Sequence, residues 1–234
     1  MHAVCANRLD LVLALRTAPG IKVDASDHEG NTALILAAYA GLDEAVIALR
    51  DMGINAADVH GDTALIIAAN ENHIGVVNIL LQAPDINVNS ANRHALTALH
   101  CAALADHQGI LCELLKADDI DVNAVDDHGH TALMLATASG HSDSVELLHK
   151  DPRIDLNSKN LWFHHALMLI KSNSEIAAGL RRDADVMVDD ETQPGPWMYM
   201  LSHLVCCVPS DQRPPHSDEI ALIARDEDAR SGLH

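Results

Sequence analysis

The string Thr-Ala-Leu, with alanine five residues after the threonine, recurs along this 234-residue chain. It starts at Thr32, Thr63, Thr97 and Thr131, at intervals of 31, 34 and 34 residues. One further interval reaches His165, where His-Ala-Leu continues the pattern without the threonine. A period of this length is typical of stacked helical repeats, in which each unit buries its apolar side against the next. The repeat therefore predicts an all-α solenoid.

Each unit carries signals for two helices and a turn. The threonine hydroxyl is suited to cap a short apolar helix. Nine residues later stands Gly41, Asn72, Asp106, Gly140 or Ser174, a position where glycine and asparagine tolerate the left-handed backbone that ends a helix. Apolar residues at helical spacing then predict a second helix, with Val76, Val77, Leu80 and Leu81, or Leu111, Leu114 and Leu115, on its buried side. The sequence Asp-x-x-Gly before the next threonine predicts a hairpin tip.

These residues resemble the ankyrin repeat family, whose pattern is Asp-x-Gly-x-Thr-Pro-Leu-His-x-Ala-Ala, then Gly-His, then Val-Val-x-Leu-Leu. Alanine replaces the family proline at positions 33, 64, 98 and 132, and only His100 keeps the first-helix histidine. Alanine is the better helix former, so the fold is unaffected. The resemblance implies helix-turn-helix units joined by short β-hairpin connections. The isoleucine–aspartate connections are similar to those of ankyrin proteins of bacteria and protists.

We divide the chain into three parts. Residues 1–182 are predicted to be the repeat stack: a truncated first repeat, full repeats from about 27, 58 and 92, a fourth from about 126 and a degenerate unit from about 160. Residues 183–225 are read as divergent capping helices, because terminal repeats of solenoids are usually atypical. Residues 226–234 are expected to be a disordered acidic tail.

Composition restricts the partner and the compartment. The formal net charge of −19 repels phosphate backbones, which argues against nucleic acid and favours a partner protein with a basic or apolar surface. The longest apolar stretch, 197–208, is too short to span a bilayer. Five scattered cysteines, without the spacing of a secreted domain, indicate a reducing compartment such as the cytoplasm. We expect a monomer.

Sixteen histidines raise the question of metal or catalysis. The family resemblance implies a structural, backbone-bonded histidine at His73, His107 and His141. His60, His94 and His128 recur at successive tips, where they are interpreted as a solvated polar edge, with partner contact and pH sensing as alternatives. Helices pack about 8–10 Å apart, so one zinc ion, with bonds of about 2.0 Å, cannot bridge that series.

The best metal candidate is the set His203, Cys206, Cys207 and His216. Its order matches no known zinc spacing, and both cysteines are equally explained as small core residues of the cap. Familiar catalytic motifs are missing from the sequence, and residues 183–234 are too few for a catalytic domain without a metal or disulfides. We predict no metal, no cofactor and no enzyme activity.

The remaining candidate site is a concave groove, which in this family is formed by the hairpin tips and the exposed side of the first helices. The residues carried over as partner-binding are Tyr39, His60, Asp62, Glu71, Arg93, His94, Leu96, Leu104, Asp127, His128, His130 and Trp162. Trp162 is a candidate aromatic anchor; the alternative is that it covers the degenerate unit after it. We predict a protein-binding scaffold. The alternative is a regulatory or targeting module of a larger protein, or an effector directed into host cells.

Overall fold

The computed structural model describes residues 1–18 and 20–160. The chain divides into two compact units, Met1–Val186 and Met187–His234, and every described residue belongs to the first. Apart from Asn160, the predicted degenerate unit, the capping helices and the acidic tail lie outside the described residues. Their boundaries remain predictions.

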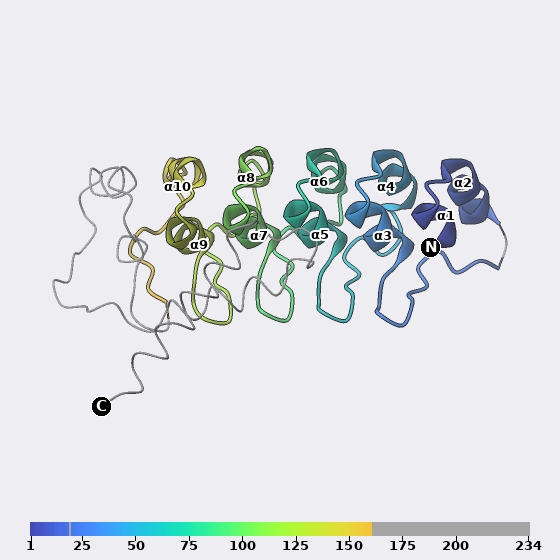
Figure 1. Cartoon of the computed structure of the whole chain (residues 1–234), viewed down its shortest axis with the longest axis horizontal. Helices are drawn as coiled ribbons and strands as arrows, with labels where there is room; N and C mark the ends of the chain where they lie inside the picture. Colours follow the sequence, from blue (N-terminus) through green and yellow to red (C-terminus); the bar gives the residue numbers. More distant parts are fainter. Residues whose placement is uncertain (19, 161–234) are drawn as a thin grey trace, which may run out of the picture. The chain divides into compact units, whose positions relative to one another are not determined.

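The described residues form ten helices and no strand, which confirms the all-α fold (Figure 1). The helices are α1 (His2–Cys5), α2 (Leu9–Thr17), α3 (Ala33–Tyr39), α4 (Asp43–Leu49), α5 (Ala64–Asn70), α6 (Ile74–Leu81), α7 (Ala98–Leu104), α8 (Gln108–Leu115), α9 (Ala132–Ser139) and α10 (Ser142–His149). The predicted β-hairpin connections are turns, two of them closed by single antiparallel bridges, Ala57 to Thr63 and Ala91 to Thr97. The hairpin geometry is therefore present without strand pairs in this part of the chain.

The helices lie in two layers. In one layer α3, α5, α7 and α9 pack side by side, and in the other α2, α4, α6, α8 and α10 do so (Figure 1). The first-helix layer is dense because its contacts are made by small side chains: Ala37, Ala38, Ala68, Ala69, Ala102 and Ala103 are all fully buried. A core with so few aromatic residues is possible because the helices approach closely.

The helix starts follow the predicted caps. The hydroxyls of Thr32, Thr63 and Thr131 accept hydrogen bonds from backbone N–H groups three residues later, at 3.2, 3.4 and 3.3 Å. The predicted turn after each first helix is also left-handed, with φ of 65° at Gly41, 61° at Asn72, 58° at Asp106 and 79° at Gly140. Both findings confirm the repeat register.

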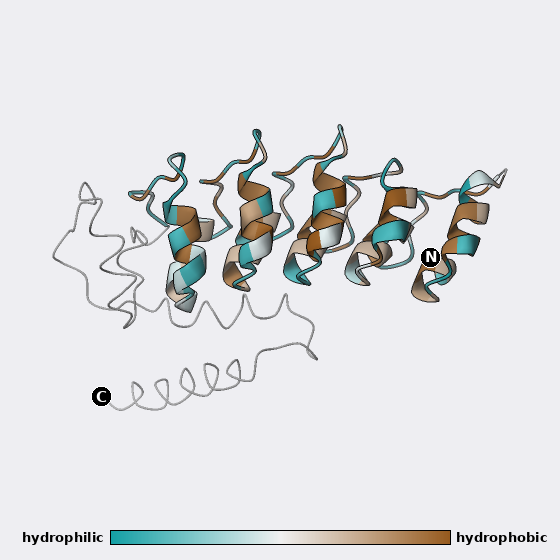
Figure 2. Ribbon diagram, turned by 90° about the horizontal axis from the view of Figure 1, so that it is seen from above, coloured by the Kyte–Doolittle hydropathy of each residue, from teal (hydrophilic) through white to brown (hydrophobic). Residues whose placement is uncertain are grey.

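The second helices bury one side. In α6 the buried residues are Val76, Val77 and Leu80, and in α8 they are Ile110, Leu111 and Leu114. Leu81 and Leu115, predicted to lie on the same side, are partly exposed. Figure 2 looks onto this layer, where hydrophobic and hydrophilic residues alternate along the helices.

An asparagine bridge, which the sequence analysis did not predict, links successive connections. The Asn89 side chain donates to the Asp119 carbonyl at 2.7 Å and accepts from the Asp121 N–H at 2.8 Å. Asn55 and Asn123 make the same pair of bonds in the units before and after. Each bridge ties two repeats together through the backbone.

Candidate protein-interaction surface

Four hairpin tips project from the first-helix layer, on the side away from the second helices (Figure 1). We name them tip 1 (27–31), tip 2 (58–62), tip 3 (92–96) and tip 4 (126–130). The first residue of each tip is Asp27, Asp58, Asn92 or Asp126. One of its side-chain oxygens accepts hydrogen bonds from the backbone N–H groups two and four residues later, at 2.7 to 3.0 Å. This repeated turn holds the tip backbone in one conformation.

Backbone hydrogen bonds join each tip to the next. Val59 N–H donates to the Glu29 carbonyl at 2.9 Å, Arg93 N–H to His60 at 2.9 Å, and Asp127 N–H to His94 at 3.1 Å. Glycine is required at Gly61 because its φ is +84° and a Cβ there would lie 2.9 Å from the Arg93 nitrogen. The four tips therefore form one continuous, hydrogen-bonded row.

The structure exposes several of the predicted partner-binding residues. Tyr39 is 46% exposed, and His60, Arg93, His94 and Asp127 are also exposed. Asp62, Glu71, Leu104 and His128 are partly exposed. Tyr39 and Leu104 end α3 and α7, so they occupy equivalent places two repeats apart. Trp162 lies outside the described residues.

Leu96 and His130 were predicted to lie on the exposed surface, and this placement is wrong. They are only 2% and 7% exposed. Both occupy the last position of a tip, which directly precedes the buried threonine cap and faces inward. The equivalent Asn31 and Asp62 are also partly buried. An apolar leucine at such a position gains by leaving water.

The three histidines predicted to be structural make the expected bonds to backbone. His73 and His141 bond through Nε2 to the carbonyls of Tyr39 and Leu104, each at 3.0 Å. His107 bonds through Nδ1 to the Ala69 carbonyl at 2.9 Å. Each ring satisfies a carbonyl at the end of the preceding first helix, which otherwise lacks a helical partner.

Carboxylates near the tips have perturbed pKa values. Burial raises the pKa of Asp62, with a contribution from Asp58, and the 2.8 Å hydrogen bond from the Asn92 amide offsets this only in part. Burial of Asp126 opposes its ionisation too. There the hydrogen bond and charge of His130 and two backbone N–H groups outweigh burial, so the Asp126 pKa lies below its usual value.

His100 is a buried polar residue beneath tips 3 and 4. Its Nδ1 accepts from the Thr97 N–H at 3.2 Å, and its Nε2 donates to the His130 carbonyl at 3.1 Å. Burial lowers the pKa of this imidazole. A neutral ring with the proton on Nε2 satisfies both partners, so His100 both caps α7 and fastens it to tip 4.

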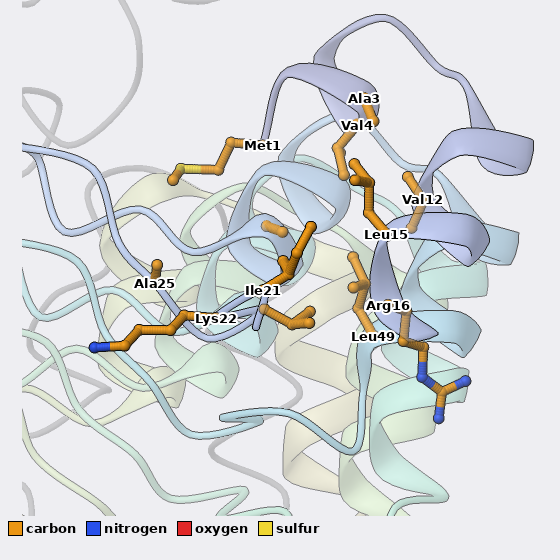
Figure 3. A pocket seen from close by; sticks show the side chains of 12 residues that line it. Met1, Ala3, Val4, Val12, Leu15, Arg16, Ile21, Lys22, Ala25 and Leu49 are labelled. Atoms are coloured by element: carbon orange, nitrogen blue, oxygen red, sulfur yellow. The ribbon is translucent and has the colours of Figure 1, made fainter. Parts of the chain in front are cut away.

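A small pocket lies in the first unit, between α1, α2 and the segment after α2. Its walls are mainly apolar and include Val4, Val12 and Leu15. The side chains of Arg16 and Lys22 lie at its edge (Figure 3). Its volume of about 80 Å³ is well below the roughly 300 to 1,000 Å³ of small-molecule sites. We assign no substrate to it. Among the described residues, no helix has the length and apolar character needed to cross a membrane.

Helix-turn-helix units with threonine-capped first helices, left-handed turns and hydrogen-bonded tips define a class of helical repeat protein. The family model of ankyrin repeats (three copies) matches residues 1–92 and 86–160, so the chain belongs to the ankyrin repeat family. The crystal structure of EF0377, described as an ankyrin repeat protein, superimposes with a TM-score of 0.70 at 25% sequence identity. That match covers 80% of this chain and 96% of the other. No curated protein sequence matches. Ankyrin repeats are generally protein–protein interaction modules, and the family is typically non-enzymatic.

Proposed function

We propose that this chain is a non-enzymatic scaffold that binds a partner protein along the concave face formed by tips 1–4 and the ends of the first helices. The row of tip-to-tip hydrogen bonds carries the proposal. A surface that is already ordered loses little conformational entropy on binding, which favours recognition of an extended partner.

The partner is proposed to present a basic segment with apolar side chains. The chain's net charge of −19 attracts cations at long range. Glu29 and Asp127 place exposed carboxylates on the tips, and the Tyr39 ring and the Leu104 side chain offer apolar contacts beside them. Trp162 is proposed as an additional anchor on sequence grounds alone. We further propose that the protein works as a monomer in a reducing compartment such as the cytoplasm, where Cys5, Cys101 and Cys112 stay reduced and form no disulfide.

The test is affinity capture with the wild-type chain and two matched double variants. The surface variant, Tyr39→Ala with Glu29→Lys, removes an aromatic contact and reverses a tip charge. The control variant, Ile47→Ala with Glu146→Lys, makes comparable changes at exposed positions of α4 and α10. We expect a specific partner to be lost from the surface variant and retained by the control. Loss from the control alone, or equal capture by all three proteins, would contradict the proposed face.

A further inference from the structure

Tip 4 brings two imidazoles and a carboxylate together within one turn. Asp126, His128 and His130 each offer one ligand atom, and the three atoms lie within 4.8 Å of one another. No second group of three His, Cys, Asp or Glu side chains meets this criterion in residues 1–18 and 20–160. The sequence analysis missed this set because it compared histidines between tips and not within a single tip.

The turn itself positions two of these groups. Asp126 Oδ1 accepts the N–H groups of His128 and His130 at 2.9 and 2.7 Å, which fixes the carboxylate. Its Oδ2 then lies 3.1 Å from His130 Nδ1. Zinc bonds of about 2.0–2.1 Å at tetrahedral angles separate two ligand atoms by roughly 3.3 Å. This pair therefore already has the spacing that a shared ion needs.

Burial differs among the three side chains in a useful way. The Asp126 side chain is fully buried and that of His130 is 9% exposed, while that of His128 is 32% exposed. Two ligands are thus rigid, and the third can adjust to close the remaining separation. The exposed side of His128 also leaves a path for an ion and for water as a fourth ligand.

The other tips show that the turn does not need these histidines. In tip 1 the last position is Asn31, whose amide donates to Asp27 Oδ2 at 3.2 Å. It makes the bond that His130 makes in tip 4. Tip 2 ends in Asp62 and tip 3 in Leu96, and both turns still form. The turn therefore forms with several different residues at its last position, and an imidazole there is not needed for the turn geometry.

A neighbouring carboxylate, that of Asp127, also favours a cation at tip 4. Asp127 contacts the His128 ring and lies 3.4 Å from His94 Nδ1. Carboxylates beside ligating histidines orient the ring and raise its basicity. The carboxylates of Asp126 and Asp127 both lie at this tip, and a divalent ion would offset their negative charge.

We propose that Asp126, His128 and His130 bind a divalent ion of the zinc type, through two imidazole nitrogens and one carboxylate oxygen. This donor set suits Zn²⁺, because imidazole and carboxylate are both ordinary zinc ligands and a fourth position remains for water. Zn²⁺ would take the place of the hydrogen between Asp126 Oδ2 and His130 Nδ1, and the metal-bound ring would carry its one proton on Nε2. The ion would crosslink the tip at one end of the proposed partner surface.

The experiment is calorimetric titration of the metal-stripped full chain with Zn²⁺. The variants His128→Asn and His130→Asn remove one ligand each, and Asn31 provides the precedent for asparagine at the second position. His60→Asn removes the equivalent of His128 from tip 2 and serves as the control. Because the chain has sixteen histidines and five cysteines, the readout is the difference between variants.

We expect the wild-type chain and His60→Asn to bind one equivalent of Zn²⁺ that either tip 4 variant binds at least tenfold more weakly. Zn²⁺ should also raise the thermal unfolding midpoint of the wild-type chain more than that of the tip 4 variants. If His130→Asn does not fold, His128→Asn decides the matter, because the turn uses the backbone N–H of residue 128, which asparagine retains. Absence of Zn²⁺ binding to the wild-type chain, or equal isotherms for wild type and both tip 4 variants, would overturn the proposal. Neither result depends on whether a partner protein binds.

Discussion

Replacing Leu114 by alanine tests how tightly the second helices are packed. Leu114 is completely buried in α8, which packs against α6, α7 and α10. Removing three carbon atoms loses about 2 to 2.5 kcal/mol of transfer free energy at about 0.8 kcal/mol each. Neighbours on three sides restrict collapse into the space left, so the cavity adds about 1 to 2 kcal/mol. We expect the free energy of unfolding to fall by about 3 to 4.5 kcal/mol.

The measurement is urea denaturation followed by far-ultraviolet circular dichroism, with Leu115→Ala as the control. Leu115 lies in the same helix but is partly exposed, so its truncation should cost about 1 kcal/mol or less. Leu80→Ala, at the equivalent buried position of α6, should resemble Leu114→Ala. A loss below about 1 kcal/mol for Leu114→Ala, or equal losses for Leu114 and Leu115, would refute the packing argument.

Two further substitutions test the connections between repeats, also by urea denaturation. Ala95 has a φ of 56° at the position where tips 1, 2 and 4 have glycine, so its backbone is strained. Ala95→Gly should therefore stabilise the chain by about 1 kcal/mol, whereas Gly61→Ala should destabilise it. A loss of stability in Ala95→Gly would contradict the strain at this position. Asn89→Ala removes both hydrogen bonds of an inter-repeat bridge and should lower the free energy of unfolding by about 1 to 2 kcal/mol. The control Asn87→Ala should cost less, because the Asn87 side chain accepts one local hydrogen bond. Equal losses of stability in the two variants would count against the bridge.

The repeat register could be predicted because each unit carries its own start and stop signals. Threonine caps the first helix and a glycine, asparagine or aspartate ends it, and both requirements are local to the backbone. The structural histidines were predicted from the family resemblance. The asparagine bridges had a visible signal, the recurring residues Asn89 and Asn123, but a hydrogen bond across a whole repeat becomes evident only once the stacking distance is known.

The candidate surface was harder to predict because exposure at a tip depends on which way each position faces. Leu96 was placed outside by analogy with the family, but the last tip position faces inward in this chain. His130 was misplaced for the same reason. The proximity of His128 and His130 to Asp126 also depends on the folding of the turn, since residues two apart in sequence come together only when the aspartate draws both N–H groups to one oxygen.

His100 predicts a dependence of stability on acid. Burial lowers its pKa from 6.5 in the folded chain, so below pH 6.5 the unfolded chain binds a proton that the folded chain does not. The free energy of unfolding therefore rises with pH between the folded pKa and 6.5, by at most about 1.4 kcal/mol per pH unit, and gains nothing from this group above that window.

His100→Met tests this dependence, and it introduces the residue found at the equivalent Met134. It should lower stability at pH 8, because the bonds to Thr97 and the His130 carbonyl are lost, yet flatten the decline between pH 7 and 5. Ile66→Met, at the same position of α5, is the control that changes packing without a titratable group and should keep the wild-type slope. Urea denaturation across this pH range, with a chelator present, makes the comparison. If His100→Met and the wild-type chain lose stability at the same rate on acidification, the His100 imidazole is not held neutral by burial.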